Sequence, residues 1–250
     1  MTDFVVVIPA RYASTRLPGK PLREIGGKPM IEHVYRRGCE SGARDVVVAT
    51  DDGRIAEAAE NFGATVCMTG DQHRSGTERI AEVADLLDWH DDTIVVNLQG
   101  DEPAMAPELI DQCATLLDES SADLATLASP ILSDEDFGNP NVVKVVLDND
   151  GFALYFSRAT IPYPRDAARL GEARAAALHH HGIYAYRCGV LRRLVASEPS
   201  ALELAEHLEH GRAVSRGMTI RVGGPAVRRG AGVDTEDDLA AAARERARGS

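Results

Sequence analysis

The hydrophobic pattern of the chain begins with a short apolar run close to its N-terminus. Residues 4–8 are all apolar, and four of the five are β-branched. A run of this kind, without polar alternation, is typical of a strand that is buried on both faces, as in the centre of a parallel sheet. We expect Pro9 to end this strand, because proline has no N–H group to donate to a strand ladder.

Apolar runs and stretches of helical periodicity then alternate as far as residue 117. Further strands are expected at residues 46–49, 64–68 and 93–98. Ser75 is the expected N-cap of one helix, because its side chain can accept a hydrogen bond from the first turn. Strands and helices alternating at this spacing predict βαβ units with right-handed crossovers. The expected helices cover residues 29–39, 53–62, 76–87 and 107–117.

From about residue 122 the pattern changes to strand-like runs separated by turn signals. These runs cover residues 124–128, 142–147, 152–156 and 183–186. The turn Asn149-Asp150-Gly151 favours a hairpin, and two strands joined so tightly must be antiparallel. The second half is therefore expected to form a mixed sheet or a sub-lobe. Residues 165–177 are charged and rich in alanine, so a mobile surface segment and a short solvated helix are both open.

Two helices are expected near the C-terminus, at residues 201–210 and 235–248. The second has Thr235 at its N-cap, acidic residues in its first turn and arginines in its last two turns. This distribution of charge suits the dipole of a helix. The whole pattern predicts an α/β fold with a central, mostly parallel but mixed sheet flanked by helices, and a smaller α+β sub-lobe.

Composition narrows the class of protein. A chain of 250 residues can build one α/β domain, and its net charge of -12 argues against a nucleic-acid partner. We expect no signal peptide, because no basic residue precedes the first apolar run, and no membrane span, because no apolar run reaches 18 residues. The scattered cysteines are expected to be reduced core thiols of a cytoplasmic protein. They are Cys39, Cys67, Cys113 and Cys188.

The loop after the first strand carries three cations, Arg11, Arg16 and Lys20. Open α/β sheets bind ligands at the carboxyl ends of their strands, so three cations there predict an anion site, with a polyphosphate as the natural ligand. Neither common glycine-rich phosphate loop is present. Pro21 stands where a P-loop needs serine or threonine, and no glycine precedes Pro18, which excludes a dinucleotide fingerprint and a nicotinamide dehydrogenase.

Two carboxylates could hold a divalent cation. Asp101 follows the strand expected at residues 93–98, so it lies at the ligand edge of the sheet. Mg²⁺ usually binds through one or two carboxylates and phosphate oxygens, which suits a carboxylate facing a triphosphate. Turn formation is the alternative for Asp101, and helix capping is the alternative for Asp234. The residues alone leave both alternatives open.

Six motifs, in order, resemble those of the sugar nucleotidyltransferases, most closely the cytidylyltransferases that act on 3-deoxy-manno-octulosonate (KDO). The resemblance implies one Rossmann-like nucleotidyltransferase domain over residues 1–250. Within it, residues 1–128 would mainly bind CTP, 129–225 would form a sugar-binding and dimerisation sub-lobe, and 226–250 would supply a metal ligand and the C-terminal helix. The motifs are Ile8–Leu22, His73–Arg79, Asn97–Pro103, Tyr155–Pro162, Gly182–Tyr184 and Gly232–Thr235.

The resemblance also implies a reaction, the Mg²⁺-dependent transfer of CMP from CTP to KDO with release of pyrophosphate. This step activates KDO for lipopolysaccharide biosynthesis, and the resemblance suggests a homodimer joined through strands of the second half. Arg11, Arg16 and Lys20 would neutralise the phosphates, and Asp101 and Asp234 would hold Mg²⁺. No protein nucleophile and no separate general base are expected. The remaining nucleotide-binding positions would be Ala10, Ser14, Arg74, Ser75 and Gln99.

The acidic sugar would need a cation for its carboxylate and polar groups for its hydroxyls. The chain departs from the family pattern at two of these places. Its His179-His180-His181 stands where Arg-His is usual, which leaves the register open by one residue, and Leu208-Glu209-His210-Gly211-Arg212 replaces Leu-Glu-Gln-Leu-Arg. The matching sugar positions are Gln99, Arg165, His180, Tyr184 and Glu209.

These departures bear on sugar preference, so alternatives remain. One is transfer to an amino analogue of KDO or to another nonulosonic acid. A sugar 1-phosphate pyrophosphorylase would more typically have a glycine-rich first loop, which is absent. An inactive nucleotide sensor fits less well, because Lys20, Asp101 and Asp234 occur together.

Zinc binding by the histidines is not favoured. Neighbouring residues on a strand point to opposite faces, so His179, His180 and His181 cannot all face one ion. His207 and His210 lie three residues apart in an expected helix and could face the same metal, although an exposed helix face is favoured.

Overall fold

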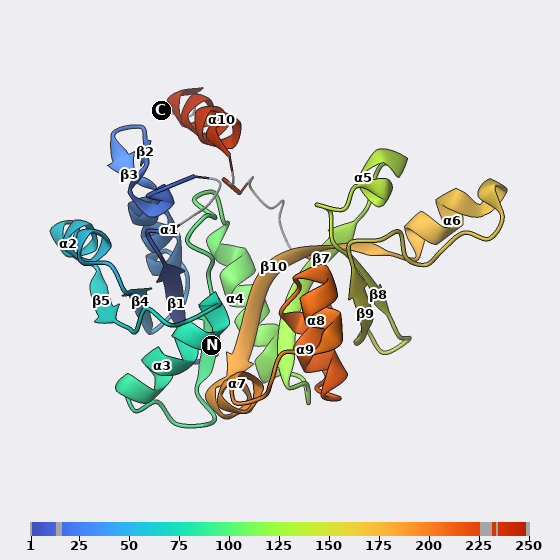
Figure 1. The fold of residues 1–250 in the computed structure, drawn as a ribbon, viewed down its shortest axis with the longest axis horizontal. Helices are drawn as coiled ribbons and strands as arrows, with labels where there is room; N and C mark the ends of the chain where they lie inside the picture. The colour runs from blue at the N-terminus through green and yellow to red at the C-terminus, as the bar shows by residue number, and fades with distance from the viewer. Residues whose placement is uncertain (1, 14–16, 226–231, 234, 249–250) are drawn as a thin grey trace.

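The computed structural model describes residues 2–13, 17–225, 232–233 and 235–248, with side chains up to residue 244. It confirms the predicted α/β class: a nine-stranded sheet lies between layers of helices, beside a separate two-stranded ribbon (Figure 1). The strands are β1 (Phe4–Ala10), β2 (Glu24–Ile25), β3 (Lys28–Pro29), β4 (Asp45–Thr50), β5 (Thr65–Met68), β6 (Ile94–Asn97), β7 (Leu124–Pro130), β8 (Lys144–Leu147), β9 (Ala153–Ser157), β10 (Leu178–Arg187) and β11 (Ile220–Gly223).

The helices alternate with these strands through the first half of the chain. They are α1 (Met30–Cys39), α2 (Gly53–Asn61), α3 (Gly76–Leu86), α4 (Pro107–Asp118), α5 (Asp134–Gly138), α6 (Leu170–Ala175), α7 (Cys188–Val195), α8 (Ala201–Glu206), α9 (His210–Ser215) and α10 (Glu236–Arg248), with 3-10 turns η1 (Lys20–Leu22) and η2 (Ala167–Arg169). Over the described ranges no helix combines the length and the apolar character needed to cross a bilayer.

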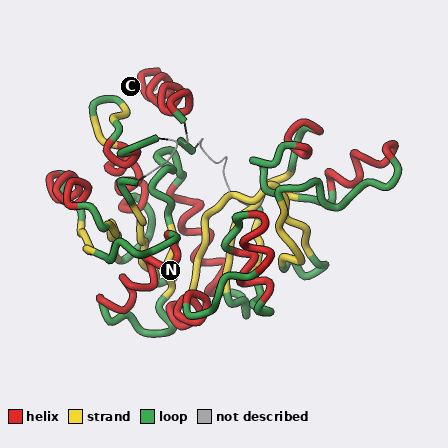
Figure 2. The backbone as a smooth tube through the Cα atoms, in the orientation of Figure 1, coloured by secondary structure: helices red, strands yellow, loops and turns green. Residues whose placement is uncertain are grey.

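Strand β1 lies at the centre of the sheet and is buried on both faces, as its composition predicts. It pairs in parallel with β4 on one side and with β6 on the other. Its even-numbered residues, such as Val6 and Ile8, pack on the side of α1, α2 and α4. Val5 and Val7 pack on the opposite side, with residues of α3 and α7. Figure 2 shows the strands of the sheet with helices around them. Full burial of each such side chain contributes about 1.5–3 kcal/mol, so this strand anchors both layers.

Pro9 does not end the first strand, which runs on to Ala10. The pairing of Pro9 with Ala49 of β4 continues the ladder. Val7 accepts a hydrogen bond from Leu98 N at 3.1 Å on the β6 side, and Pro9, two residues on, faces the same side. Pairing with β6 stops at Val7 and Asn97, so the missing N–H of Pro9 costs the sheet no ladder bond.

The second half of the chain adds antiparallel strands, as predicted. Strand β10 runs antiparallel to both β6 and β7, and the hairpin of β8 and β9 branches from it. Helices α5 and α6 extend away from the main sheet beyond this hairpin (Figure 1). Residues 165–177 therefore include a short helix. Its Ala173 and the following Ala177 are buried against Ile131 and Phe137, which fixes the segment on the sub-lobe.

The single helix expected at residues 201–210 is wrong. Helix α8 ends at Glu206, and His207 takes a left-handed conformation with φ of 52° before α9 begins at His210. The two helices pack closely. A Cβ on Gly211 would lie only 3.0 Å from Glu203 N, so the contact requires a glycine there. Arg212 and Glu203 form a buried ion pair of 2.6 Å across the junction. His207 and His210 therefore do not share a helix face.

The cysteine prediction holds for two of the four residues. Cys113 and Cys188 are buried, and burial raises the pKa of both thiols, that of Cys188 to about 11. Cys39 is exposed and Cys67 is only half-buried, so the assignment of these two to the core is wrong. Cys39 is the last residue of α1, where the helix leaves the sheet.

A small apolar cluster joins the first loop to the last helix, separate from the two main cores. It consists of Leu17, Ile25, Met30, Val233 and Leu239. Arg23 forms two hydrogen bonds of 2.7 and 2.9 Å with the carboxylate of Glu236 beside it. Thr235 caps α10 by accepting a bond from Asp238 N at 3.3 Å, as predicted. Helix α10 accordingly lies beside the ribbon of β2 and β3 (Figure 1).

Candidate active site

Two adjoining hollows open at the ligand edge of the sheet. The first, of about 280 Å³, is lined by residues of the β1 loop, the start of α3 and the turn after β6. The second, of about 430 Å³, lies between β10, the hairpin of β8 and β9, and the α8–α9 junction. Gln99, Asp101 and Glu209 line both hollows, so the two form one continuous site.

The β1 loop brings two cations into the first hollow. Arg11 is exposed and lines it directly. Gly19 adopts φ of 66°, and a Cβ there would lie 3.1 Å from the Tyr12 ring, so only glycine fits this turn without strain. The turn starts η1 and leaves Lys20 buried, with its Nζ donating to Asp101 Oδ2 at 2.8 Å. Ser14 and Arg16, also predicted here, lie outside the described residues.

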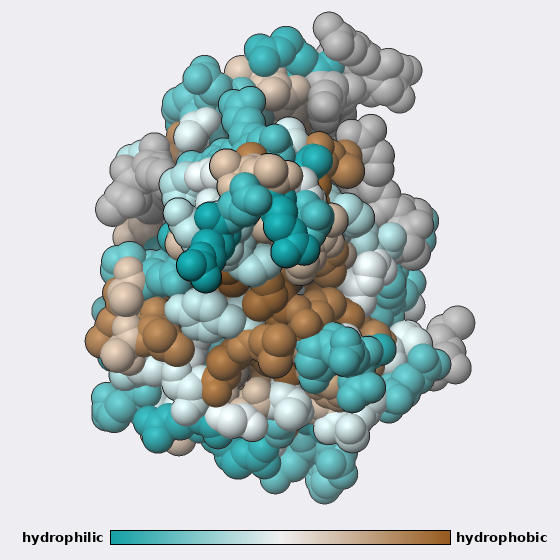
Figure 3. Space-filling view, turned by 90° about the vertical axis from the view of Figure 1, so that its right-hand side faces the viewer, coloured by the Kyte–Doolittle hydropathy of each residue, from teal (hydrophilic) through white to brown (hydrophobic). Residues whose placement is uncertain are grey.

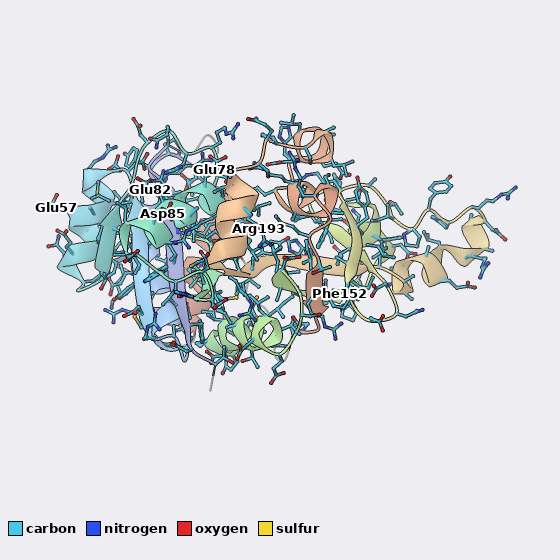
Figure 4. The ribbon with its side chains drawn as sticks, turned by 90° about the horizontal axis from the view of Figure 1, so that it is seen from below. Glu57, Glu78, Glu82, Asp85, Phe152 and Arg193 are labelled. Carbon is cyan, nitrogen blue, oxygen red and sulfur yellow. The ribbon has the colours of Figure 1, made fainter. Side chains whose placement is uncertain are left out.

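Helix α3 directs its N-terminus at the same hollow. Ser75 caps the helix by accepting a hydrogen bond from Glu78 N at 3.2 Å, which confirms its predicted role as N-cap. Burial raises the pKa of the Glu78 carboxyl, but bonds from the Arg74 backbone and side chain outweigh it and lower that pKa overall. Glu78 thereby holds Arg74 beside the hollow. Figure 4 shows Glu78, Glu82 and Asp85 on successive turns of α3.

Asp101 lies where the two hollows meet. Gly100 before it passes so close to β1 that a Cβ would be 2.9 Å from Pro9 O. The Asp101 side chain is 38% exposed, and its backbone oxygen accepts a hydrogen bond from Val233 N at 2.9 Å. Asp234, the second expected metal ligand, lies outside the described residues. A carboxylate that is partly open, at the edge of an anion site, has the oxygen donors that Mg²⁺ prefers.

Aromatic and imidazole rings form the wall of the second hollow. The rings of His180 and Tyr184 are 5.1 Å apart, and His210 packs on Phe156 at 4.1 Å. The Tyr184 hydroxyl and His210 Nδ1 are 2.7 Å apart. Burial, together with the charge of Arg158, lowers the pKa of His210 to about 3, so this imidazole is neutral near pH 7.

Glu209 faces the hollow from the α8–α9 junction. It remains open to solvent, yet the surrounding protein desolvates it and raises the pKa of its carboxyl. The Thr77 hydroxyl donates a hydrogen bond to it, which partly offsets this rise. Such a carboxylate can accept hydrogen bonds from sugar hydroxyls.

The three neighbouring histidines divide between the two sides of β10. The rings of His179 and His181 lie 5.2 Å apart, while His180 packs with Tyr184 and Phe156. All three nevertheless contribute to the lining of the second hollow, next to an irregularity in the strand register between His180 and Tyr184. Across the described chain, no group of three or more His, Cys, Asp or Glu side chains is placed to hold a metal ion.

Most of the predicted site residues that the structure describes meet in these hollows. Ala10, Arg74 and Ser75 line the first, and His180 and Tyr184 line the second. Arg165 is the exception, because it is exposed in the segment before α6 and lines neither hollow. Sequence reasoning assigned no role to Arg158 or Thr77, which line the second hollow. It favoured an exposed helix face for His210, which is wrong, because this side chain is buried and lines the same hollow. Arg158 belongs to the motif Tyr155–Pro162, and this membership is the feature of the sequence that could have identified it as a site residue.

Comparisons with known proteins all point to cytidylyltransferases. A family model described as "Cytidylyltransferase" matches residues 5–220. A protein of Vibrio vulnificus named 3-deoxy-manno-octulosonate cytidylyltransferase is 53% identical over 239 residues, covering 95% of both chains. A protein of the same name from Pseudoalteromonas translucida is 52% identical over 242 residues, also covering 95% of both chains.

Solved structures give the same picture. A CMP:2-keto-3-deoxy-manno-octonic acid synthetase complexed with CTP superposes with a TM-score of 0.90, at 43% identity and with full coverage of both chains. The 4-diphosphocytidyl-2C-methyl-D-erythritol synthase of Anaerococcus prevotii superposes with a TM-score of 0.63 over 98% of this chain and 96% of its own. At 14% identity, this second likeness supports the shared fold alone.

Proposed function

The chain belongs to the cytidylyltransferase family, and on that premise we propose that it transfers CMP from CTP to KDO, forming CMP-KDO and pyrophosphate. The observation that carries this proposal is the junction of the two hollows, where Lys20 and Asp101 form an ion pair. Cations line the hollow on one side of it, and polar and aromatic groups suited to a sugar line the other. A nucleotide and a sugar can therefore meet at this point.

The first hollow suits the nucleotide. Arg11, Lys20 and Arg74 supply positive charge, and the N-terminus of α3 adds the favourable end of a helix dipole. A triphosphate that enters would compete with Asp101 for the Lys20 ammonium group. Positive charge on the β- and γ-phosphates stabilises the pyrophosphate that leaves. We propose the same role for Arg16, and nucleotide contacts for Ala10, Ser14, Ser75 and Gln99.

The reaction itself is one in-line displacement. The anomeric hydroxyl oxygen of KDO forms a bond to the α-phosphorus of CTP, the bond from that phosphorus to the bridging oxygen breaks, and pyrophosphate leaves with the electron pair. The hydroxyl proton passes to solvent. No protein nucleophile is needed, so the chain contributes orientation and electrostatic stabilisation. Gln99, His180, Tyr184 and Glu209 would orient the sugar.

We propose Mg²⁺ as the cofactor, with Asp101 and Asp234 as its ligands. Asp101 fits this role, since its carboxylate is partly exposed at the junction of the hollows. When bound, Mg²⁺ would neutralise phosphate charge and lower the pKa of the attacking hydroxyl.

The test measures pyrophosphate released by the purified protein given Mg²⁺, CTP and KDO, with each omitted in turn. Asp101→Ala and Asp234→Ala should each lower the rate at least about 100-fold, because each would remove a ligand of the Mg²⁺ that neutralises phosphate charge in the transition state. CTP affinity, measured by calorimetry, shows whether a variant still folds and binds. Full activity in either variant contradicts the assignment of that residue.

The acceptor remains the finer question, because of the departures at His179–His181 and His210. Release with only an amino analogue of KDO, or with another nonulosonic acid, would keep the reaction and change the sugar. Tight CTP binding without release from any sugar would favour a nucleotide sensor.

We also propose a homodimer joined through the sub-lobe. Large apolar side chains are exposed there, namely Leu132, Leu154, Tyr163, Leu202 and Leu204. Figure 3 faces this end of the molecule and shows a hydrophobic area below a hydrophilic one. Exposed apolar area of this kind often marks an interface between proteins. Sedimentation of the pure protein measures the mass of the assembly directly. The cytoplasmic location and the role in lipopolysaccharide synthesis stay predictions.

A further inference from the structure

The charge balance of the second hollow limits where an acidic sugar can bind. KDO carries one carboxylate, and a carboxylate that leaves water needs a cation or several donors to replace its hydration. The hollow already contains two acidic side chains, Asp101 and Glu209. Among the described residues that line it, Arg158 is the only lysine or arginine.

Arg158 is held in place by its surroundings. Its Nε donates to Glu206 O at 2.7 Å, and its Nη1 donates to Pro140 O at 3.1 Å. Its backbone carbonyl accepts a bond from Lys144 Nζ at 2.6 Å, and Lys144 is fully buried. The guanidinium is thereby fixed through two of its nitrogens. Within the described part of the chain, its Nη2 group takes no part in these bonds.

Glu206 fixes the backbone of the same residue. Its carboxylate accepts a hydrogen bond from the Arg158 backbone N–H, one from Tyr155 Oη at 3.0 Å and one from Ser157 Oγ at 2.9 Å. These bonds attach the end of β9 to the C-terminal end of α8. Anchoring of this kind limits the entropy that an arginine would lose on binding an anion.

We propose that Arg158 is a specificity-determining residue that binds the carboxylate of the acceptor sugar, and that Glu206 positions it. This inference rests on the proposed function and deepens it, because it makes the second hollow selective for acidic sugars over neutral ones.

The other candidate cations are less suitable. Arg165, which the family resemblance implies as a sugar-binding residue, is exposed and lines neither hollow. His210 lines the hollow, but burial and the neighbouring Arg158 keep its imidazole neutral near pH 7. Arg11, Lys20 and Arg74 line the first hollow, where the phosphates of CTP need them. Arg158 is therefore the side chain in the second hollow whose permanent positive charge can bind the carboxylate of the sugar.

The test compares Arg158→Gln and Arg165→Gln in the full-length protein. Steady-state rates are measured with KDO and with its C1 amide, which has the same hydroxyls but no charge. Arg158→Gln should raise the KM for KDO about 10- to 100-fold, the range expected for the loss of one charge-assisted contact. The variant should also lose most of the preference of the wild-type protein for KDO over the amide. Arg165→Gln should keep that preference.

Two controls separate binding from folding. Arg158→Lys keeps the charge, so it should recover part of the preference for KDO, whereas a purely structural role would not follow the charge. Arg216→Gln removes an exposed arginine outside both hollows and should leave the kinetics unchanged. Calorimetric titration with CTP alone should give the wild-type affinity for every variant.

The possible outcomes are distinct. Arg158→Gln with an unchanged KM and an unchanged ratio between KDO and amide overturns the proposal, as does loss of that ratio in Arg165→Gln alone. Wild-type protein that releases no pyrophosphate with KDO would instead refute the proposed function itself. If the wild-type protein is active and Arg158→Gln changes neither the KM nor the preference for KDO, the proposed function stands and only the role of Arg158 is refuted.

Discussion

His210 is a residue whose environment makes the stability of the protein depend on pH. Its side chain is buried, and its pKa is lowered from an ordinary value of 6.5 to about 3. Between these two values the unfolded chain binds a proton that the folded chain does not, so stability is lost as pH falls. From pH 7 to pH 5, this residue alone should cost about 2 kcal/mol of unfolding free energy.

The matching variant is His210→Gln, which restores the residue that the family pattern has at this position. Urea unfolding at pH 7, 6 and 5 should show a smaller decrease in stability for the variant than for the wild type. Both proteins keep the surrounding titratable groups, including Glu209 and His180, so the difference between the two curves isolates His210. Parallel curves would mean that His210 binds a proton in the folded state as readily as in the unfolded chain.

The sequence predicted the role of a residue correctly where that role depends only on its near neighbours in the chain. Ser75 and Thr235 cap their helices as expected, because an N-cap depends on neighbours three residues away. Arg158 and Arg165 could not be distinguished in the same way. Both are arginines that follow the strand expected at residues 152–156, and only the pairing of β8 with β9 and β10 places Arg158 at the hollow.

At the scale of elements, the junction of α8 and α9 depends on a residue without a side chain. A Cβ at Gly211 would lie 3.0 Å from Glu203 N and 3.3 Å from Glu203 Cα, and backbone atoms cannot move aside cheaply. Gly211→Ala should therefore lower the unfolding free energy by about 1–3 kcal/mol, the usual cost of overpacking. It should also raise the KM for the sugar, because α9 begins next to Glu209.

Gly53→Ala provides the control for this prediction. Gly53 begins α2, and nothing lies within 4 Å of a Cβ built there. That variant should be neutral or up to about 1 kcal/mol more stable, because alanine restricts the unfolded chain more than glycine does. Chemical denaturation of both variants gives the comparison. Equal stabilities for the two would show that α8 and α9 can separate without cost.

The missed element boundaries share a physical cause. The single helix expected at residues 201–210 had the right periodicity, but His207 adopts a left-handed conformation, and Gly211 and Arg212 pack α9 back against Glu203. Pro9 was expected to end β1. The strand continues to Ala10 because Pro9 faces the β6 side, where the pairing has already stopped at Val7. Both outcomes depend on tertiary contacts, between neighbouring helices in one case and between β1 and β6 in the other, and hydrophobic periodicity does not contain them.

The whole molecule carries a net charge of -12, from 39 acidic and 27 basic residues. Such an excess destabilises the compact state through self-repulsion, and salt screens it. Exposed ion pairs, such as that of Arg44 with Asp3, are weakened by salt but contribute at most about 1 kcal/mol each. We expect the melting temperature to rise between low and moderate NaCl concentration. A calorimetric scan in which it falls would mean that the ion pairs outweigh the repulsion.

The order of the fold along the chain was largely predictable, since alternating strands and helices require a parallel sheet with helices on both faces. The position of β10 was not. It is inserted between β6 and β7, antiparallel to both, and this choice of neighbours brings the histidines of the second half beside Gln99 and Asp101. Nothing in the local pattern of β10 specifies that placement.

The apolar cluster of Leu17, Ile25, Met30, Val233 and Leu239 has a consequence for synthesis on the ribosome. The loop that carries Lys20 leaves the exit tunnel before most of the sheet is made, yet two of the five side chains in this cluster are Val233 and Leu239. Domains of a nascent chain usually fold as units as they emerge. The cluster that supports the Lys20 loop is therefore incomplete until Val233 and Leu239 have been made, so a chain stalled before residue 233 would hold a nearly complete sheet without this support.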